Sequence, residues 1–372
     1  MTVTLEALFN LAIDRRYLLR RAGAAGGLAA AARVLGVPTA WAQAEGPALV
    51  TQIRSLANEY HAIWAMGGDN FAASVGLADN HQIQTTEGDS QKGISGIRSA
   101  VAASGKDTVV NVDPNDAPDA RPMVLAVEDA QGWIVTHWNK PADLHPRDFE
   151  HYVAHIAADG VAAGREVGRS LFEAMGGEGG IVAVQGILDN VPAQQRFQGL
   201  EEALAEYPNV TLLEVQPAEW DQTKALNLMD NWLTKYGDEI AGVWAANDGM
   251  GLGCLEALRA QGRAGEVPIV GVDGTSQAVQ AVIDGEFAAT MANDPFLQGG
   301  LGLSLGYHAW LGELVPSNEP PEHREFFYRT ILVTPENAAE HLATVAVGNV
   351  DYDWNDLWFA VDDGGAASTP TA

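Results

Sequence analysis

The sequence predicts an α/β fold made of two doubly wound lobes, each built on a parallel sheet of about six strands. From residue 47 onward, short apolar runs alternate with amphipathic helical patterns, which is typical of parallel sheets covered by helices on both faces. There are about eleven or twelve such units, more than one open sheet usually holds. The chain length of 372 residues also exceeds that of one typical core.

The expected elements follow one another in strict alternation. The apolar runs that predict strands include 109–112, 133–136, 181–184, 240–246, 267–272 and 287–292. The helical patterns between them include 161–175, 193–207, 223–236, 249–261 and 276–285. In 223–236, the spacing of Leu226, Met229, Leu233 and Tyr236 by three and four residues predicts one buried helical face.

The N-terminus has the three parts of a secretory signal. Arg15 and Arg16 precede a small apolar run at 22–32, and an Ala-Gln-Ala site ends at Ala44. The paired arginines resemble the twin-arginine export signal, whereas the alternative is an ordinary amphipathic first helix. We expect residues 1–44 to be a signal peptide and the rest to be exported to the periplasm. No later stretch reaches 18 uninterrupted apolar residues.

Charge and cysteine content exclude several classes of protein. Lys and Arg number 21 against 49 Asp and Glu, a formal charge of −28, which argues against nucleic acid as a partner. The single cysteine, Cys254, forms neither an internal disulfide nor a zinc cage. We expect no cofactor and no metal. The stretch 351–362 begins like a calcium loop but departs from it at Asp356 and Asp362, which leaves calcium binding and an acidic extension open.

Polar and aromatic residues gather where the expected strands end. Carboxylates, amides and one guanidinium form paired hydrogen bonds with adjacent hydroxyls, and aromatic rings supply flat apolar walls. Because ligands bind beyond the carboxyl ends of parallel strands, the set predicts a small, neutral polyhydroxy ligand. The alternative is that these residues cap helices and form turns; Asp248 is read as such a cap and left out. The candidates at the strand ends are Asp113, His137, Trp138, Arg196, Trp220, Asn247, Asp273 and Asn293.

Several short motifs in a fixed order carry a family resemblance. The runs at 155–159, 164–168, 194–199, 216–221, 246–250 and 270–275 resemble those of ribose-type periplasmic binding proteins, of the type I fold. The resemblance covers about 47 to 345 and is densest from 151 to 300. It implies three hinge crossings, near 158–159, 293–295 and 328–330. The implied N-terminal lobe is 47–157 plus 295–328 and the C-terminal lobe 158–293 plus 329–345, with an extension at 346–372 whose end is expected to be disordered.

The resemblance also implies a function and roles for single residues. It implies capture of a monosaccharide or sugar alcohol by hinge closure and delivery to the membrane permease of an ABC importer, with the ATPase on another chain. Arg196 would bind ring or hydroxyl oxygens and Trp220 would stack on the sugar, while Asn247, Asp273 and Asn293 would bind hydroxyls. In the first lobe, Tyr60 would be an aromatic wall, with Asn58 and His61 as polar contacts and Asp113 in a position that is usually polar.

One departure bears on the ligand. Many pentose binders carry an Asp-Arg pair where this sequence has His137 and Trp138, so ribose itself is not favoured. We expect a monomer that is not an enzyme. Two alternatives stay open: an exported sugar sensor that presents ligand to a chemoreceptor or sensor kinase, and an exported carbohydrate-active enzyme using Asp113 and Asp273. A repressor of the same fold would need an N-terminal DNA-reading module in place of the export signal.

Overall fold

The computed structural model describes residues 46–362. Contacts divide the chain into Met1–Gly46 and Pro47–Ala372, and both sheets belong to the second unit. The export signal expected in 1–44 and the disordered end expected after 362 lie outside the described residues. Within them, none of the helices is both long and apolar enough to cross a membrane.

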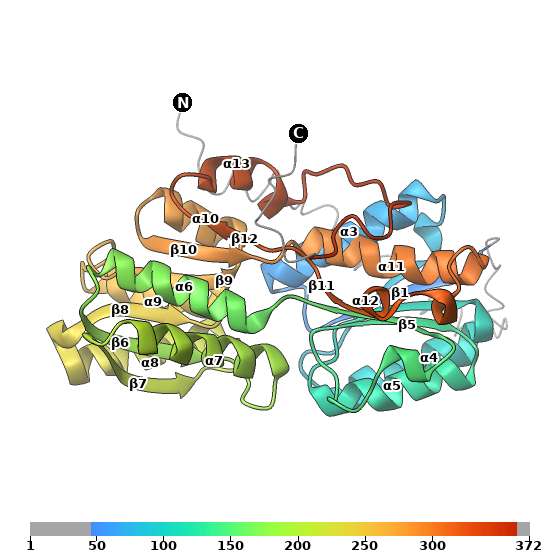
Figure 1. Ribbon diagram of the computed structural model, residues 1–372, viewed down its shortest axis with the longest axis horizontal. Coiled ribbons are helices and arrows are strands. Elements are labelled where there is room, and N and C mark those ends of the chain that lie inside the picture. The colour runs from blue at the N-terminus through green and yellow to red at the C-terminus, as the bar shows by residue number, and fades with distance from the viewer. Residues whose placement is uncertain (1–45, 363–372) are drawn as a thin grey trace, which may run out of the picture. The chain divides into compact units, whose positions relative to one another are not determined.

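The first sheet has six parallel strands in the order β11-β5-β4-β3-β1-β2 (Figure 1). Together with its helices it forms what we call the N-terminal lobe. The strands are β1 (Ala48–Ile53), β2 (His81–Thr85), β3 (Thr108–Val112), β4 (Trp133–His137), β5 (Tyr152–Ala157) and β11 (Glu325–Phe327). The helices are α3 (Glu59–Ser74), α4 (Ser90–Ser104), α5 (Ala117–Asp129), α11 (Pro295–Leu311) and the short α12 (Pro321–Arg324).

The second sheet, in the C-terminal lobe, also has six strands, in the order β12-β10-β9-β8-β6-β7. Five of them run parallel, and β12, the last strand along the chain, pairs antiparallel with β10. The strands are β6 (Gly179–Gln185), β7 (Val210–Pro217), β8 (Ile240–Ala245), β9 (Ile269–Asp273), β10 (Phe287–Ala292) and β12 (Ile331–Val333). The helices are α6 (Gly160–Ala174), α7 (Val191–Glu206), α8 (Gln222–Tyr236), α9 (Asp248–Ala260), α10 (Ser276–Ile283) and α13 (Ala338–Ala343).

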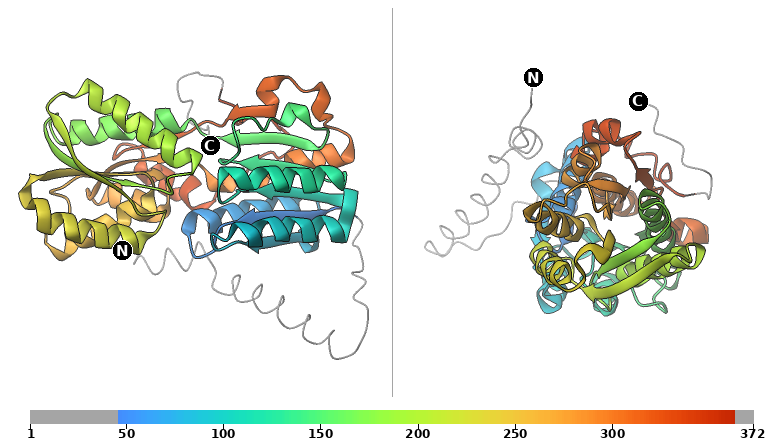
Figure 2. Two further views of the ribbon diagram at one scale, coloured as in Figure 1. Left: turned by 90° about the horizontal axis from the view of Figure 1, so that it is seen from below. Right: turned by 90° about the vertical axis from the view of Figure 1, so that its left-hand side faces the viewer.

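The two-lobed, doubly wound architecture expected from the sequence is confirmed, and the chain passes between the sheets repeatedly (Figure 2). It crosses from β5 to α6, from β10 to α11 and from β11 to β12. After the 3-10 turn Val345–Val347 it returns once more to the N-terminal lobe, where Trp354 packs. This fourth connection was not expected, because the family resemblance ended near residue 345.

Each lobe has its own apolar core, because the central strands are buried on both faces. The β3 strand has five buried residues in succession, and the large ring of Trp244 on β8 is fully buried. The buried face of α8 is turned slightly from the expected one: Ala225, Met229 and Trp232 are buried, whereas Leu226 and Leu233 are only partly covered. Leu233 packs against the core of this lobe from its edge.

Paired glycines bring two helices into close contact in each lobe. A Cβ on Gly164 of α6 would stand 2.0 Å from the carbonyl oxygen of Arg196, and one on Gly199 of α7 would stand 2.1 Å from that of Val161. Gly67 of α3 and Gly299 of α11 meet in the same reciprocal way. Because a side chain at these positions would collide with backbone, the glycines set how near the helices lie.

Candidate functional site

The carboxyl ends of the strands of the two lobes bring nine of the eleven predicted residues together. Direct contacts link them across the interface between the lobes. We call this set the interlobe cluster; it consists of Tyr60, His61, Asp113, Trp138, Arg196, Trp220, Asn247, Asp273 and Asn293.

Arg196 lies at the centre of the cluster, in the second turn of α7. It is only 4% exposed, and its Nη1 donates to the carbonyl oxygen of Ala246 at 2.7 Å. The Cζ atom lies 5.3 Å from the ring centroid of Trp138 and 5.7 Å from that of Trp220. One indole therefore comes from each lobe, so the guanidinium links the lobes through cation–π contacts.

Asp273 places a carboxylate next to this guanidinium. Its Oδ1 lies 3.8 Å from Arg196 Nη1 and accepts a hydrogen bond from Asn293 Nδ2 at 3.3 Å. Asn247 also bonds to this carboxylate. Burial raises the pKa of Asp273 because the charged form loses its water, and the nearby Arg196 offsets only part of this effect. The carboxylate and its amide neighbours form a compact set of acceptors and donors.

The N-terminal lobe contributes a connected chain of hydrogen bonds. Trp138 Nε1 donates to the Tyr60 hydroxyl at 3.0 Å, and this hydroxyl donates to Gln298 Oε1 at 2.8 Å. Burial is the largest reason that the pKa of Tyr60 is raised well above its usual value. Beside it, His61 Nε2 lies 3.4 Å from Asp113 Oδ2. The Tyr60 ring is thus held in one orientation at the start of α3.

Both tryptophans of the interlobe cluster have a backbone conformation that is rare for residues other than glycine. Trp138 has φ 59° and Trp220 has φ 64°, in the left-handed region that bulky side chains seldom adopt. Gly186, after β6, makes room for the second ring: a Cβ there would lie 2.1 Å from a carbon of the Trp220 indole. Such strain persists only where the surroundings impose it, and it is concentrated at functional sites.

The other two predicted residues, Asn58 and His137, make structural contacts instead. Asn58 caps α3, its side chain accepting from the backbone N–H of Tyr60 at 2.9 Å. The His137 ring packs edge-on against Trp64, with centroids 4.6 Å apart, inside the N-terminal lobe. Burial lowers the pKa of His137 to about 3. β4 ends at His137, and Trp138 follows it with a left-handed backbone, so the ring of His137 lies in the core of the N-terminal lobe whereas the ring of Trp138 meets Arg196 of the other lobe.

The helix cap expected at Asp248 is wrong. Asn247 caps α9, with its Oδ1 accepting from Met250 N at 3.0 Å. Asp248 instead accepts from Thr290 Oγ1 at 2.6 Å and from the backbone and hydroxyl of Thr275. It ties β10 to the start of α10, and burial is the main reason that its pKa is raised.

Gln298 contacts the interlobe cluster but was not among the residues predicted from the sequence. It is fully enclosed in α11, accepts from Tyr60, and its Nε2 donates to the carbonyl oxygen of Asn293. It therefore connects both halves of the interlobe cluster. The sequence offers one signal for Gln298, because it is a single amide side chain in an otherwise largely apolar helical segment. The spacing of residues does not indicate which groups this amide contacts.

Further contacts hold the lobes together outside the cluster. Asn190 Nδ2 donates to the carbonyl oxygen of Asn115 at 2.7 Å. On α3, Glu59 Oε1 accepts from the Ser276 backbone N–H at 3.1 Å and from its hydroxyl. The α10 helix has no side-chain cap of its own, so Glu59 of the other lobe fills this position. Burial is the largest reason that the pKa of Glu59 is raised.

Metal binding has no support in the part of the chain that the structure describes. Among residues 46–362, no three His, Cys, Asp or Glu side chains are grouped so as to hold an ion. In the calcium-like stretch, Asp353 Oδ1 accepts from the backbone and side-chain nitrogens of Asn355 instead.

Comparison with known proteins identifies the family. The periplasmic binding protein domain family matches residues 52–314. The xylitol-binding protein of Mycolicibacterium smegmatis is 35% identical over 193 residues, which cover 51% of this chain and 53% of that protein. The ribose import binding protein RbsB of Haemophilus influenzae is 36% identical over 168 residues, covering 45% and 56%. The chain thus spans about half the length of these curated relatives.

A solved structure matches more fully. The twin-arginine translocation pathway signal protein from Burkholderia phytofirmans is 44% identical, with a TM-score of 0.82, covering 85% of this chain and 98% of that one. The family match, the paired six-stranded sheets and the crossings between them agree with one another. The chain therefore belongs to the periplasmic binding protein family.

Proposed function

We propose that this protein is an extracytoplasmic solute-binding protein that captures an uncharged monosaccharide or sugar alcohol between its lobes. It delivers that ligand to the membrane permease of an ABC importer whose ATPase is a separate chain. In this proposal the interlobe cluster holds the ligand, and closure of the lobes secures it, because the ligand contacts both lobes only when they meet.

Unsatisfied buried polar atoms in the interlobe cluster carry the proposal. Among the described residues, His61 Nδ1, Arg196 Nε and Asn293 Oδ1 are buried without a hydrogen-bond partner. A buried polar group without a partner costs about 1–3 kcal/mol, so such atoms call for one. A hydroxyl both donates and accepts, and a polyhydroxy ligand therefore satisfies this mixture of atoms from both lobes.

The charge of the cluster favours a neutral ligand. Arg196 faces Asp273, and Asp113 lies next to His61. The phosphate group of a phosphorylated sugar would bring a further negative charge next to these carboxylates, and like charges at short range repel. Relatives support the same class, since one is named for xylitol and another for ribose import.

The test is a direct measurement of binding. Purified protein lacking residues 1–44 is screened by thermal shift against pentoses, hexoses and alditols, with ribose 5-phosphate as the charged control. A neutral ligand at 100 times its Kd stabilises by about 2.7 kcal/mol, which raises Tm by roughly 2–4 °C or more. Asp273→Asn is expected to weaken the binding found at least tenfold in calorimetry. A rise in Tm with ribose 5-phosphate alone, or no rise in Tm with any of the sugars and alditols, contradicts the proposal.

Export through the twin-arginine pathway is part of the proposal. The pair Arg15-Arg16 supports it, and the solved relative from Burkholderia phytofirmans is named for that pathway. A reporter fused after residues 1–44 is expected to reach the periplasm, and replacing both arginines by lysine is expected to keep it in the cytoplasm. Undiminished export of the double variant contradicts this part.

A further inference from the structure

The chain beyond the third crossing follows a path that the proposed function does not explain. Helix α13 packs against α10 in the C-terminal lobe, and the turn Val345–Val347 continues there. Gly348, with φ 64°, then redirects the chain, and a Cβ at this position would lie 2.7 Å from the ring of Phe296 at the start of α11. We call residues 349–362 the C-terminal strap.

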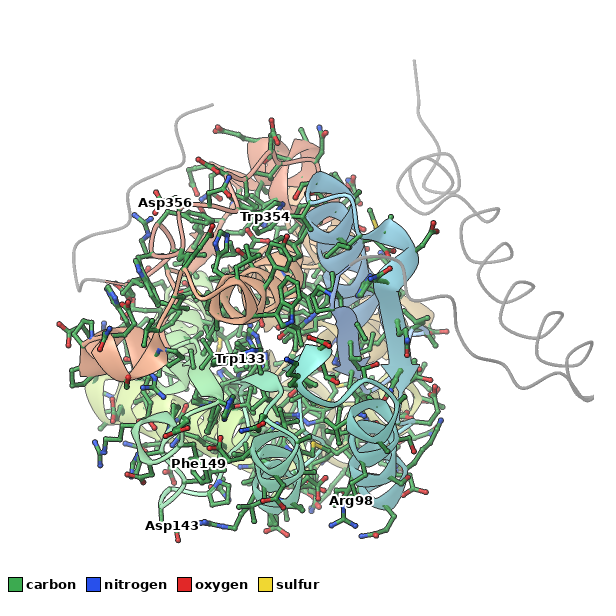
Figure 3. The ribbon with its side chains drawn as sticks, turned by 90° about the vertical axis from the view of Figure 1, so that its right-hand side faces the viewer. Arg98, Trp133, Asp143, Phe149, Trp354 and Asp356 are labelled. Carbon is green, nitrogen blue, oxygen red and sulfur yellow. The ribbon has the colours of Figure 1, made fainter. Side chains whose placement is uncertain are left out.

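The strap is anchored in the N-terminal lobe by Trp354, which is labelled in Figure 3. Its Nε1 donates to Asn70 Oδ1 of α3 at 2.8 Å, and its carbonyl oxygen accepts from Ser304 Oγ of α11 at 2.6 Å. Gly300 leaves room for the seat of the indole, meaning the place where the Trp354 ring packs, because a Cβ there would lie 2.2 Å from the ring. The strap is therefore closely packed against the N-terminal lobe.

From this anchor the strap contacts the second hinge crossing. The Tyr352 hydroxyl donates to Asp294 Oδ2. Asp294 stands between β10 and α11 with φ 38°, in the left-handed region, and its Oδ1 caps α11 by accepting from Leu297 N at 2.9 Å. Residues in this backbone region are held there by their surroundings. Tyr352 is one of the groups that hold Asp294.

The end of the strap contacts the third crossing. Arg329 N donates to the carbonyl oxygen of Ala360 at 3.0 Å, and Asp362 N donates to that of Phe327 at 2.7 Å. Tyr328 and Val361 form an antiparallel bridge. Two of the three crossings are thus bonded to one segment that enters from the C-terminal lobe and is anchored in the N-terminal lobe.

We propose that the C-terminal strap is a fourth hinge connection that favours the arrangement in which the lobes touch, and so sets ligand affinity. The bonds of the strap coexist in this structure with the interlobe contacts of Arg196 and Trp138. When the hydrogen bond from Tyr352 is lost, the backbone of Asp294 is free to change from its left-handed conformation. This change allows the two lobes to rotate about the second crossing. A protein that is less often closed binds with an apparent affinity reduced by the same fraction.

The test compares Tyr352→Phe with wild type in the full chain without residues 1–44. We expect a larger ligand-free radius of gyration in small-angle X-ray scattering and a Kd about tenfold higher, the factor that matches loss of one hydrogen bond to a carboxylate. Gly300→Ala, which disturbs the seat of Trp354 without touching the hinge, is expected to change both quantities in the same direction.

Tyr207→Phe is the matched control. It removes a hydroxyl that lies 3.5 Å from Glu173 Oε1, a carboxylate on the surface of the C-terminal lobe, and is expected to change neither quantity. An unchanged radius of gyration in Tyr352→Phe overturns the proposal, as does a lower unfolding free energy with wild-type affinity. The scattering readout needs no ligand, so it distinguishes failure of the strap from failure of the proposed function on which the affinity readout rests.

Discussion

Replacing Arg196 by lysine separates the effect of charge from that of the planar guanidinium. Lysine keeps the positive charge near Asp273 but presents a compact ammonium on a flexible stem. In the structure the guanidinium meets Trp138 and Trp220, donates to the Ala246 carbonyl, and has Nε left for a ligand. A single ammonium does not reproduce these four interactions together.

The expected loss follows from those contacts. A desolvated cation–π contact contributes about 1–2 kcal/mol, and a hydrogen bond about 0.5–1.5 kcal/mol. Losing one of each amounts to about 1.5–3.5 kcal/mol, which is about a 10- to 400-fold higher Kd. Because the Trp138 contact joins the two lobes, this loss acts partly through closure. Isothermal titration calorimetry with the ligand found by screening measures it.

Arg165→Lys is the matched control. Arg165 lies on α6, where its Nη1 donates to Glu202 Oε2 at 2.8 Å in an ion pair whose side chains are 31% and 39% exposed. Ion pairs that water reaches contribute about 0–1 kcal/mol. We expect wild-type affinity for this variant. A Kd for Arg196→Lys within threefold of wild type, or an equal loss in Arg165→Lys, would refute the role of the guanidinium.

Three further predictions concern the surroundings of the cluster. The pKa of His137 is lowered to about 3 in the folded chain, whereas its pKa in the unfolded chain is about 6.5. Stability therefore falls as pH falls, and His137→Leu is expected to lose about 2 kcal/mol less than wild type between pH 8 and pH 5; equal losses in urea unfolding contradict this. Gly186→Ala places a methyl group 2.1 Å from the Trp220 ring, so we expect Kd to rise at least tenfold, and unchanged affinity shows that the ring position is irrelevant. Ser276→Ala removes the hydroxyl that donates to Glu59 across the lobes but keeps the backbone donor; we expect a three- to tenfold higher Kd, and scattering identical to wild type in the ligand-free state argues against a closing role.

The fold was predictable from the sequence because its central strands, such as β3 and β8, are largely apolar and buried and several of its helices are amphipathic. The run 240–246 was expected as a strand and β8 is Ile240–Ala245; the pattern 161–175 was expected as a helix and α6 is Gly160–Ala174. These patterns depend on residues near one another in the chain. The crossings came from the family resemblance, and the strand order was not predicted, since local periodicity specifies neither.

The site was predictable only in part, for a physical reason. Polar residues at strand ends converge because all parallel strands point the same way, and this brought Arg196 and Asp273 together as expected. His137 was grouped with Trp138, yet His137 ends β4 and packs in the core, whereas the left-handed backbone at Trp138 turns that ring toward the other lobe. The hydrogen bond between Glu59 and Ser276 joins residues 217 positions apart. No pattern of neighbouring residues in the sequence predicts such a pair. Gln298 is found only once α3 and α11 are seen to meet.

The glycine pair of α6 and α7 limits how the proposed sugar site could be redesigned to build a sensor. Gly164 fits against the peptide carbonyl of Arg196 itself, so the position of the helix backbone, and hence the aim of the guanidinium, depends on a residue that never meets the ligand. Libraries that vary ring and amide side chains to change selectivity should keep this glycine constant, because any larger residue would shift the whole recognition surface before a single designed contact forms.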